Sequence, residues 1–373
     1  MQFSEVIGQQ DVKERLLRQV QENRVPHAML FTGPEGCGKL AMAVAFANYL
    51  LCQNPHDGDS CGTCPACRQI AKMGHPDLHF SFPFIKKSTG TTTCENYISD
   101  WKQFISNGYY FGLSDWLEAI SSDNKSAIIT EAEGDNIIDK LSIASYSGGY
   151  KVMIIWLPER MHDAADNNLL KMLEEPAAKT VFILVSNDTT PILSTILSRT
   201  QHMEFQRLSA DDIARALQER NGLDRNMAVQ VARTAGGSYL NALRYININN
   251  ESDSYFDEFV NLMRKAYSRD VQGLQQWADD VTKWGRDKQK SFLSYCQNML
   301  RENFIYNFHL PELNYMTDKE SDFAKKFSRF INERNIVEFT EAFSRAQRDV
   351  EQNVNSKTIF FDFALKTIIL IRK

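Results

Sequence analysis

The first two hundred residues alternate between short apolar runs and longer segments with apolar residues at helical spacing. Continuous apolar runs, typical of strands buried in a parallel sheet, occupy 28–31, 152–157 and 181–185. A further run at 78–82 alternates between apolar and polar residues. Between these runs, helical periodicity occupies 9–22, 41–51 and 163–175, and Thr130-x-x-Glu133 predicts a capping box that opens one more helix. Strands that alternate with helices predict a three-layer α/β domain with a parallel sheet.

The pattern changes after Phe205, where strand-like runs give way to helical periodicity. A polar run at 247–254 is a candidate linker between a short helical part and a longer one. The apolar stripes of the longer part are typical of a packed helical core. We therefore expect an α/β domain over residues 1–206, a small all-α part over 207–250 and an all-α domain over 251–373.

A glycine-rich turn follows the first predicted strand. Residues 33–40, Gly-Pro-Glu-Gly-Cys-Gly-Lys-Leu, fit the phosphate-binding pattern G-x-x-x-x-G-K, and the flanking strand and helix make a chance match the weaker interpretation. Gly33, Gly36 and Gly38 would let backbone N–H groups turn towards a phosphate, and Lys39 would reach the terminal phosphates. The motif normally continues with Ser or Thr, which holds Mg²⁺, but here the next residue is Leu40. The loop is suited to a phosphate and poorly suited to the metal.

A second requirement for ATP hydrolysis is also missing. In a phosphate-loop ATPase the central strand ends in acidic residues that act on Mg²⁺ and on the attacking water. Here the run ends in Trp156-Leu157-Pro158, and Glu159 comes later than that register requires. The sequence therefore predicts a nucleotide-type fold with little or no hydrolysis of its own.

Four cysteines lie within sixteen positions, at Cys52, Cys61, Cys64 and Cys67. Three of them have C-x₂-C spacing, which suits tetrahedral Zn²⁺. Four incidental thiols are the alternative, but thiols rarely cluster in this way without a role. Because four protein ligands leave no open position, we expect a structural zinc module over residues 52–67.

Residues from about 85 to 125 are rich in Ser, Thr, Gly and aromatic side chains and are predicted to be an insertion. Exposed aromatics could stack on a partner or on single-stranded nucleic acid. A small local core is the interpretation we favour.

The composition of the chain argues against two classes of protein, strongly basic nucleic-acid-binding proteins and membrane-spanning proteins. Hydrophobic residues make up 43% of the 373 residues and the formal net charge is −5, so the whole chain is not a basic nucleic-acid wrapper. No stretch of 18 uncharged apolar residues and no signal-like N-terminus occur. We expect a cytoplasmic protein whose cysteines are thiols or metal ligands.

Taken in order, these features resemble the bacterial clamp-loader subunits of the AAA+ class, over about residues 1–246. The resemblance rests on the phosphate loop, the four cysteines and four short motifs. The motifs are Val6-Ile7-Gly8-Gln9, Pro26-His27-Ala28, Asn168-Leu169-Leu170-Lys171-Met172-Leu173-Glu174-Glu175-Pro176 and Thr195-Ile196-Leu197-Ser198-Arg199.

The resemblance implies an AAA+ nucleotide-binding domain with an embedded zinc module, a helical lid and a helical collar that joins subunits into an open ring. Such rings use ATP to place a sliding clamp on primed DNA. It implies that Val6 and Ile7 lie with the loop at the nucleotide, and that Ser198 and Arg199 lie at the subunit edge. Arg199 would then enter a neighbour's ATP site as an arginine finger. An ordinary surface salt bridge is the alternative role for Arg199.

Departures from the family pattern favour a non-hydrolysing subunit. Active gamma/tau-type subunits have Ser or Thr at position 40, acidic residues in place of Trp156-Leu157, and an arginine in the lid motif that here is Gly237-Ser238-Tyr239-Leu240. The expected partners are other loader subunits, with the sliding clamp and primer–template DNA reached through the complex. Whether ATP or ADP binds without hydrolysis stays open.

Two alternatives remain. One is an active gamma/tau-type ATPase of the same loader. The other is a zinc-dependent nucleic-acid-binding module on an AAA-like scaffold, for which the support is weak: basic residues near the cysteines are Arg68, Lys72, Lys86 and Lys87, opposed by Asp57 and Asp59.

Overall fold

The computed structural model describes residues 1–373 except 88–89, 121–125, 251, 310–313, 315 and 353. The chain forms two compact units, Met1–Leu243 and Arg244–Lys373. The first contains the sheet and the predicted lid as far as Leu243, and the regular elements that the structure describes in the second are all helices.

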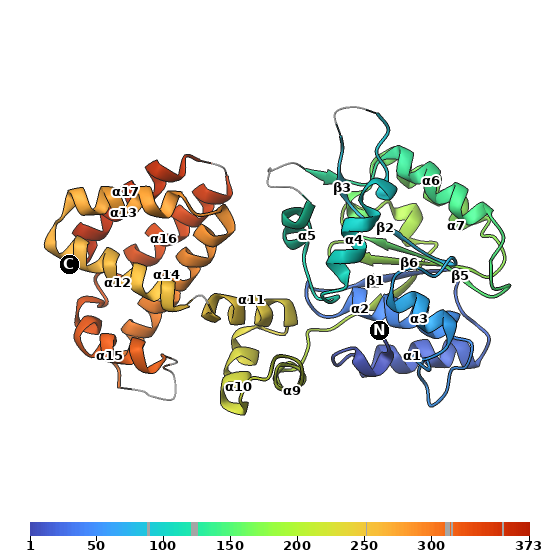
Figure 1. The fold of residues 1–373 in the computed structure, drawn as a ribbon, viewed down its shortest axis with the longest axis horizontal. Coiled ribbons are helices and arrows are strands. Elements are labelled where there is room, and N and C mark those ends of the chain that lie inside the picture. The colour runs from blue at the N-terminus through green and yellow to red at the C-terminus, as the bar shows by residue number, and fades with distance from the viewer. Residues whose placement is uncertain (88–89, 121–125, 251, 310–313, 315, 353) are drawn as a thin grey trace. The chain divides into compact units, whose positions relative to one another are not determined.

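A five-stranded, fully parallel sheet forms the centre of the first unit (Figure 1). Its strand order is β2-β5-β6-β1-β7, and the strands are β1 (Ala28–Thr32), β2 (Leu78–Ser81), β5 (Lys151–Trp156), β6 (Thr180–Ser186) and β7 (Gln201–Glu204). The buried runs β1, β5 and β6 were predicted from their continuous apolar sequence. The edge strand β7 was not, because its sequence, Gln-His-Met-Glu, carries one buried apolar residue.

Helices cover both faces of the sheet, which gives the three layers expected from the sequence. On one face lies α2 (Lys39–Leu51), which packs against α1 (Gln10–Gln21) and α3 (Pro65–Ala71). The other face is covered by α6 (Glu131–Ser142), α7 (Asp163–Glu174) and α8 (Ser194–Leu197), whose apolar residues share one core with β1, β5 and β6.

The predicted insertion builds a local aromatic core, as favoured from its composition. A short antiparallel pair, β3 (Phe84–Ile85) and β4 (Ala127–Ile128), brackets η2 (Cys94–Tyr97), α4 (Ile98–Ile105) and α5 (Leu113–Ile120). Trp101 and Trp116 are fully buried, and the Trp101 ring stacks on Phe82 with centroids 4.2 Å apart. Trp156, the last residue of β5, contacts the Trp101 ring at 5.4 Å and the Phe111 ring at 5.2 Å. The insertion is therefore packed onto the end of a central strand.

The predicted helix α6 is present, but the predicted capping box at its start is wrong, because the side chains of Thr130 and Glu133 bind other groups. Thr130 occupies the N-cap position without a side-chain capping bond, and its hydroxyl instead donates to the Thr92 carbonyl at 3.2 Å. The Glu133 carboxylate accepts hydrogen bonds from the Cys94 backbone N–H at 2.8 Å and from Asn136 at 3.0 Å. Both side chains tether the insertion, a long-range role that spacing alone does not reveal.

Three helices follow the sheet: α9 (Ala210–Asn221), α10 (Arg225–Thr234) and α11 (Tyr239–Asn250). The polar run 247–254, a candidate linker in the sequence, is mostly helical, because α11 continues to Asn250 and α12 begins at Ser252. The division between the two units falls within α11.

The second unit packs its helices around one apolar core. They are α12 (Ser252–Ser268), α13 (Val271–Thr282), α14 (Arg286–Tyr306), α15 (Asp318–Phe327), η5 (Ser328–Phe330), α16 (Ile336–Glu351) and α17 (Ser356–Leu370). Within the part of the chain that the structure describes, no helix is both long and apolar enough to cross a membrane.

Candidate functional site

The phosphate-type loop lies between β1 and α2, with Gly38 in the left-handed region (φ +96°) as the N-cap. Lys39 begins the helix but turns back onto its own loop, where its Nζ donates to the carbonyls of Gly33 and Pro34, both at 2.7 Å. The side chain is buried, and burial lowers the pKa of Lys39, although the negative charge of Glu159 opposes that shift. The lysine that would meet a phosphate is thus bonded to the chain itself.

Tyr110, from the segment between α4 and α5, covers the loop. Its hydroxyl oxygen accepts a hydrogen bond from the Ile7 backbone N–H at 2.9 Å. A Cβ placed on Gly38 would lie 3.1 Å from that oxygen. Burial raises the pKa of Tyr110 to about 12, so the phenol stays neutral and keeps its proton. Val6 and Ile7, expected to be near a nucleotide, are buried, and Ile7 is bonded to Tyr110.

The lid helices also contact the loop directly. The Tyr239 backbone N–H donates to the Gly36 carbonyl at 3.0 Å. A Cβ on Gly36 would collide with the Ser238 hydroxyl and lie 2.9 Å from Cβ of Leu240. The rings of Tyr110 and Tyr239 meet edge to face with centroids 5.0 Å apart. The glycines of the loop therefore make room for the chain's own groups.

The contacts of the lid, Tyr110 and Lys39 with the loop determine whether a nucleotide can bind there. The strand, loop and helix have the arrangement that phosphate binding needs, but the surface around Gly36 and Gly38 is in contact with the lid and Tyr110. Lys39 has its hydrogen bonds within the loop. In this arrangement the residues present do not fit a bound nucleotide.

Two places where a metal site would need side-chain oxygens, the position after Lys39 and the end of β5, carry apolar residues. Leu40 is buried, Trp156 belongs to the insertion's aromatic core, and Leu157 is buried with a left-handed backbone (φ +57°). After Leu157 the chain turns into a short 3₁₀ helix, η3 (Pro158–Arg160).

This turn brings Glu159 to the same edge, which register counting did not predict. Its Oε1 accepts a hydrogen bond from the Asn187 backbone N–H, just after β6, at 2.9 Å. Its other oxygen, Oε2, is buried and has no hydrogen-bond partner among the described residues. Pro158 was the available signal, because a proline that redirects the backbone makes counting along the strand unreliable.

Arg199 is the second residue after α8 and is partly exposed. Its Nη2 is 2.7 Å from Oε1 of Glu174, the last residue of α7, and its Nη1 donates to the Thr195 carbonyl at 3.0 Å. The hydroxyl of the exposed Ser198 also donates to Thr195, at 3.1 Å. Within the chain, Arg199 has the salt bridge that was the alternative to a finger role.

The four cysteines converge. One sulfur from each of Cys52, Cys61, Cys64 and Cys67 lies within 4.8 Å of the other three. The Cys52–Cys61 sulfurs are 3.5 Å apart and the Cys61–Cys67 sulfurs 3.9 Å apart. Tetrahedral zinc with bonds of about 2.3 Å requires sulfurs about 3.8 Å apart, so the cluster could bind Zn²⁺.

The cysteine loop also fixes the start of the chain. The Asp59 carboxylate accepts hydrogen bonds from the backbone N–H groups of Phe3 and Ser4, at 2.8 and 2.9 Å. Asn48 on α2 donates to the Met1 carbonyl and to the Ser60 hydroxyl, both at 2.9 Å. The segment that leads to Ile7 is therefore anchored on the loop between the first two cysteines.

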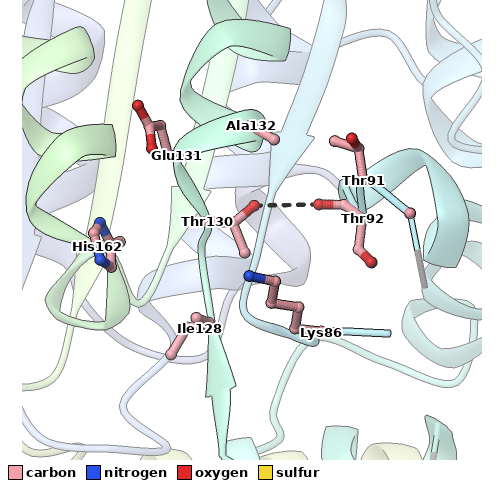
Figure 2. A pocket seen from close by; sticks show the side chains of 9 residues that line it. Lys86, Thr91, Thr92, Ile128, Thr130, Glu131, Ala132 and His162 are labelled. Carbon is pink, nitrogen blue, oxygen red and sulfur yellow. Dashed lines mark hydrogen bonds between the residues drawn. The ribbon is translucent and has the colours of Figure 1, made fainter. Parts of the chain in front are cut away.

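A separate polar cavity of about 310 Å³ lies at the start of α6 (Figure 2). The bond from Thr130 to the Thr92 carbonyl crosses its wall. Its lining, which the sequence did not single out, consists of Lys86, Gly90, Thr91, Thr92, Ile128, Thr130, Glu131, Ala132 and His162. None of these belongs to the phosphate-type loop or to the Ser198-Arg199 step.

The family comparison and the comparison with curated proteins both match subunits of DNA polymerase III. The model of the family described as "DNA polymerase III, delta subunit" matches residues 8–209. DNA polymerase III subunit delta' of Yersinia pestis is 31% identical over 187 residues, which cover 50% of this chain and 43% of the relative. DNA polymerase III subunit tau of Bacillus subtilis (strain 168) is 28% identical over 211 residues, which cover 57% of this chain and 30% of the relative.

Among solved structures, a DNA polymerase III gamma subunit-related protein from Thermotoga maritima aligns at a TM-score of 0.43 and 14% identity, over 97% of this chain and 100% of that chain. The matched regions of the two curated relatives span less than half of their own lengths. The family model covers more than half of this chain's residues, and the chain therefore belongs to the DNA polymerase III clamp-loader family whose model is described as "DNA polymerase III, delta subunit".

Proposed function

We propose that the chain is a non-catalytic, stator-like subunit of the delta-prime type. It helps to load the sliding clamp on primed DNA during replication, and it supplies Arg199 to the ATP site of a neighbouring subunit. Its direct partners are the delta and gamma/tau subunits of the loader. It reaches the clamp and primer–template DNA through the assembled complex.

The observation that carries the proposal is a set of three apolar residues beside the loop, Leu40, Trp156 and Leu157. Phosphoryl transfer to water needs a bound metal ion and a group that positions the water. Leu40 and Leu157 are buried, and Trp156 is packed against Trp101 and Phe111. These three positions offer no side-chain oxygen to a metal.

The surface position of Arg199 supports the second half of the proposal. Its pairing with Glu174 is a partly exposed ion pair, and such pairs contribute at most about 1 kcal/mol. An arginine held this weakly can exchange its carboxylate for the phosphate of a nucleotide on another chain. There it would stabilise the charge that develops during transfer.

Zinc has a structural role in this proposal. With four thiolate ligands the ion has no open coordination position. It would hold the loop 52–67 in the shape in which Asp59 anchors the backbone of Phe3 and Ser4.

ATP turnover by the purified chain tests the proposal. We expect no magnesium-dependent ATP hydrolysis above background from the chain alone, whereas a loader reconstituted with it hydrolyses ATP. Robust turnover by the chain alone that Lys39→Ala abolishes would contradict a non-catalytic role.

Glu159 favours one second candidate, an active gamma/tau-type ATPase. Its carboxylate lies at the carboxyl edge of the sheet, acts electrostatically on Lys39, and has a buried oxygen without a partner among the described residues. If this carboxylate served a metal, Glu159→Gln would remove turnover while leaving the fold intact. Turnover that is absent from both the native chain and the variant excludes this candidate.

A further inference from the structure

We infer that Tyr110 is a built-in occupant of the nucleotide site, and that together with the lid it closes the phosphate-type loop against ATP and ADP. The inference goes beyond the proposed function, which concerns hydrolysis and not binding. A chain that bound nucleotide without hydrolysing it would still serve as a stator.

The first step is the position of the phenol. Tyr110 reaches the loop from the insertion, far along the chain, and its hydroxyl takes the Ile7 backbone N–H as donor at 2.9 Å. The same oxygen and the ring carbon Cε1 approach Gly38 so closely that a Cβ there would lie 3.1 and 3.2 Å from them. An aromatic ring with one polar oxygen thus occupies the space above the glycine that opens α2.

The second step is the lid, which rests on the other glycine of the loop. Tyr239 donates its backbone N–H to the Gly36 carbonyl at 3.0 Å, and its ring packs edge to face on Tyr110. The Tyr239 hydroxyl donates to Asn221 on α9 at 2.9 Å. Tyr110 therefore contacts the lid, the loop and the N-terminal segment at once.

The third step is the lysine. Lys39 has two carbonyl acceptors inside the loop and is buried beneath these contacts. An incoming phosphate would have to displace Tyr110 from Gly38, lift the lid from Gly36 and break both lysine bonds. A site that is open in only a small fraction of molecules binds its ligand more weakly by that fraction.

Two explanations for the absence of nucleotide binding predict different results. A loop that has lost the groups that bind phosphate would stay unable to bind, whereas a loop that is covered by a side chain would bind once that side chain is removed. If Tyr110 keeps the site closed, its removal should create nucleotide binding. The loop retains its glycines, its lysine and the N-terminus of α2, which are the groups that hold phosphate.

The experiment uses the full chain in four forms: native, Tyr110→Ala, Tyr110→Phe and Tyr146→Ala. Tyr146 is 81% exposed, so its truncation controls for the loss of a tyrosine. Binding of ATP and of ADP is measured by calorimetry with and without Mg²⁺. Circular dichroism and thermal melting establish that each variant is folded.

We expect the native chain, Tyr146→Ala and Tyr110→Phe, which keeps the ring, to show no saturable binding. Tyr110→Ala should show saturable nucleotide binding, at least about tenfold tighter than the weakest binding that the calorimetry would detect for the native chain. Equal binding by the native chain and Tyr110→Ala would overturn the inference. So would binding by neither, because Tyr110 would then not be what excludes nucleotide.

Hydrogen exchange gives an independent readout that does not require a variant. In the native chain, ATP should leave the exchange of residues 33–40 and of the Ile7 amide unchanged, and protection of these amides by ATP would overturn the inference. Tyr110→Ala should speed exchange at Ile7, whose acceptor it removes. Nucleotide binding by the native chain without turnover overturns only this inference, whereas turnover overturns the proposed function.

Discussion

The guanidinium of Arg199 lies 2.7 Å from the carboxylate of Glu174, so an ion pair joins the end of α7 to the segment that follows α8. The pair is partly exposed on both sides, and neither group is committed to the core. If Arg199 acts as a finger, replacing Arg199 should lower the ATPase activity of the loader, whereas replacing Glu174 should leave it unchanged.

In a reconstituted loader, Arg199→Ala should reduce turnover at the one ATP site that receives the arginine by about 10³-fold or more, while the complex still assembles. Arg199→Lys should restore little, because lysine lacks the planar fork of donors. The measurements are steady-state ATPase and assembly by size-exclusion chromatography. Unchanged ATPase in an intact complex would remove the finger role.

Glu174→Gln is the matched control, because it breaks the same ion pair and leaves the arginine in place. We expect its ATPase to equal that of the native loader and its stability to change by less than about 1 kcal/mol. If Glu174→Gln reduced ATPase as much as Arg199→Ala does, the pair would be structural.

Metal content is the second prediction. The purified chain should carry about one zinc ion, and Cys64→Ser should lose it and unfold at a lower temperature, because metal binding contributes to folding free energy. Cys94→Ser is the control, since Cys94 is buried away from the cluster and its replacement should leave the metal content unchanged. A folded native chain without metal contradicts the zinc assignment.

The third prediction concerns the aromatic core of the insertion. Trp101→Ala should lower the free energy of unfolding by about 3–5 kcal/mol, because it leaves a cavity among Phe82, Phe111 and Trp156. The exposed Tyr146→Ala should change it by less than about 0.5 kcal/mol. Chemical denaturation measures both, and similar small effects would mean that the insertion is not packed as described.

The fourth prediction is a pH dependence from His79 on β2. Burial, aided by the positive charges of Lys140 and Lys151, lowers the pKa of His79 from 6.5 to about 4. The unfolded chain therefore binds a proton at a higher pH than the folded chain does. The associated stability is complete above pH 6.5 and is lost as the pH falls towards 4.

Since His79 is partly screened by solvent, we expect a loss of up to about 3 kcal/mol across this window. His79→Gln should flatten that slope in denaturation curves recorded between pH 7 and pH 4. An identical slope in the native chain and in His79→Gln would contradict the assignment.

The fold was largely predictable from the sequence because its signals are local. Continuous apolar runs mark β1, β5 and β6, and the spacing of the four cysteines anticipated their convergence. The polar edge strand β7 carries no such run and was missed.

The arrangement of the candidate site was predictable only in part, because its decisive contacts are long-range. Tyr110 reaches Ile7 across 103 positions, and no periodicity in either segment signals that meeting. Glu159 arrives at the sheet edge through the left-handed turn at Leu157, which a count along an ideal strand does not include. Glu174 could be placed on its helix, but its pairing with Arg199 required the structure.

Trp156 joins the end of β5 to the aromatic core of the insertion. A carboxylate at this position would have to be buried where the indole now touches Trp101 and Phe111, and a buried unpaired charge costs several kcal/mol. The aromatic neighbours would have to change before an acid could be tolerated. We therefore expect Trp156→Asp to destabilise the packing of the insertion onto β5 instead of creating a metal ligand.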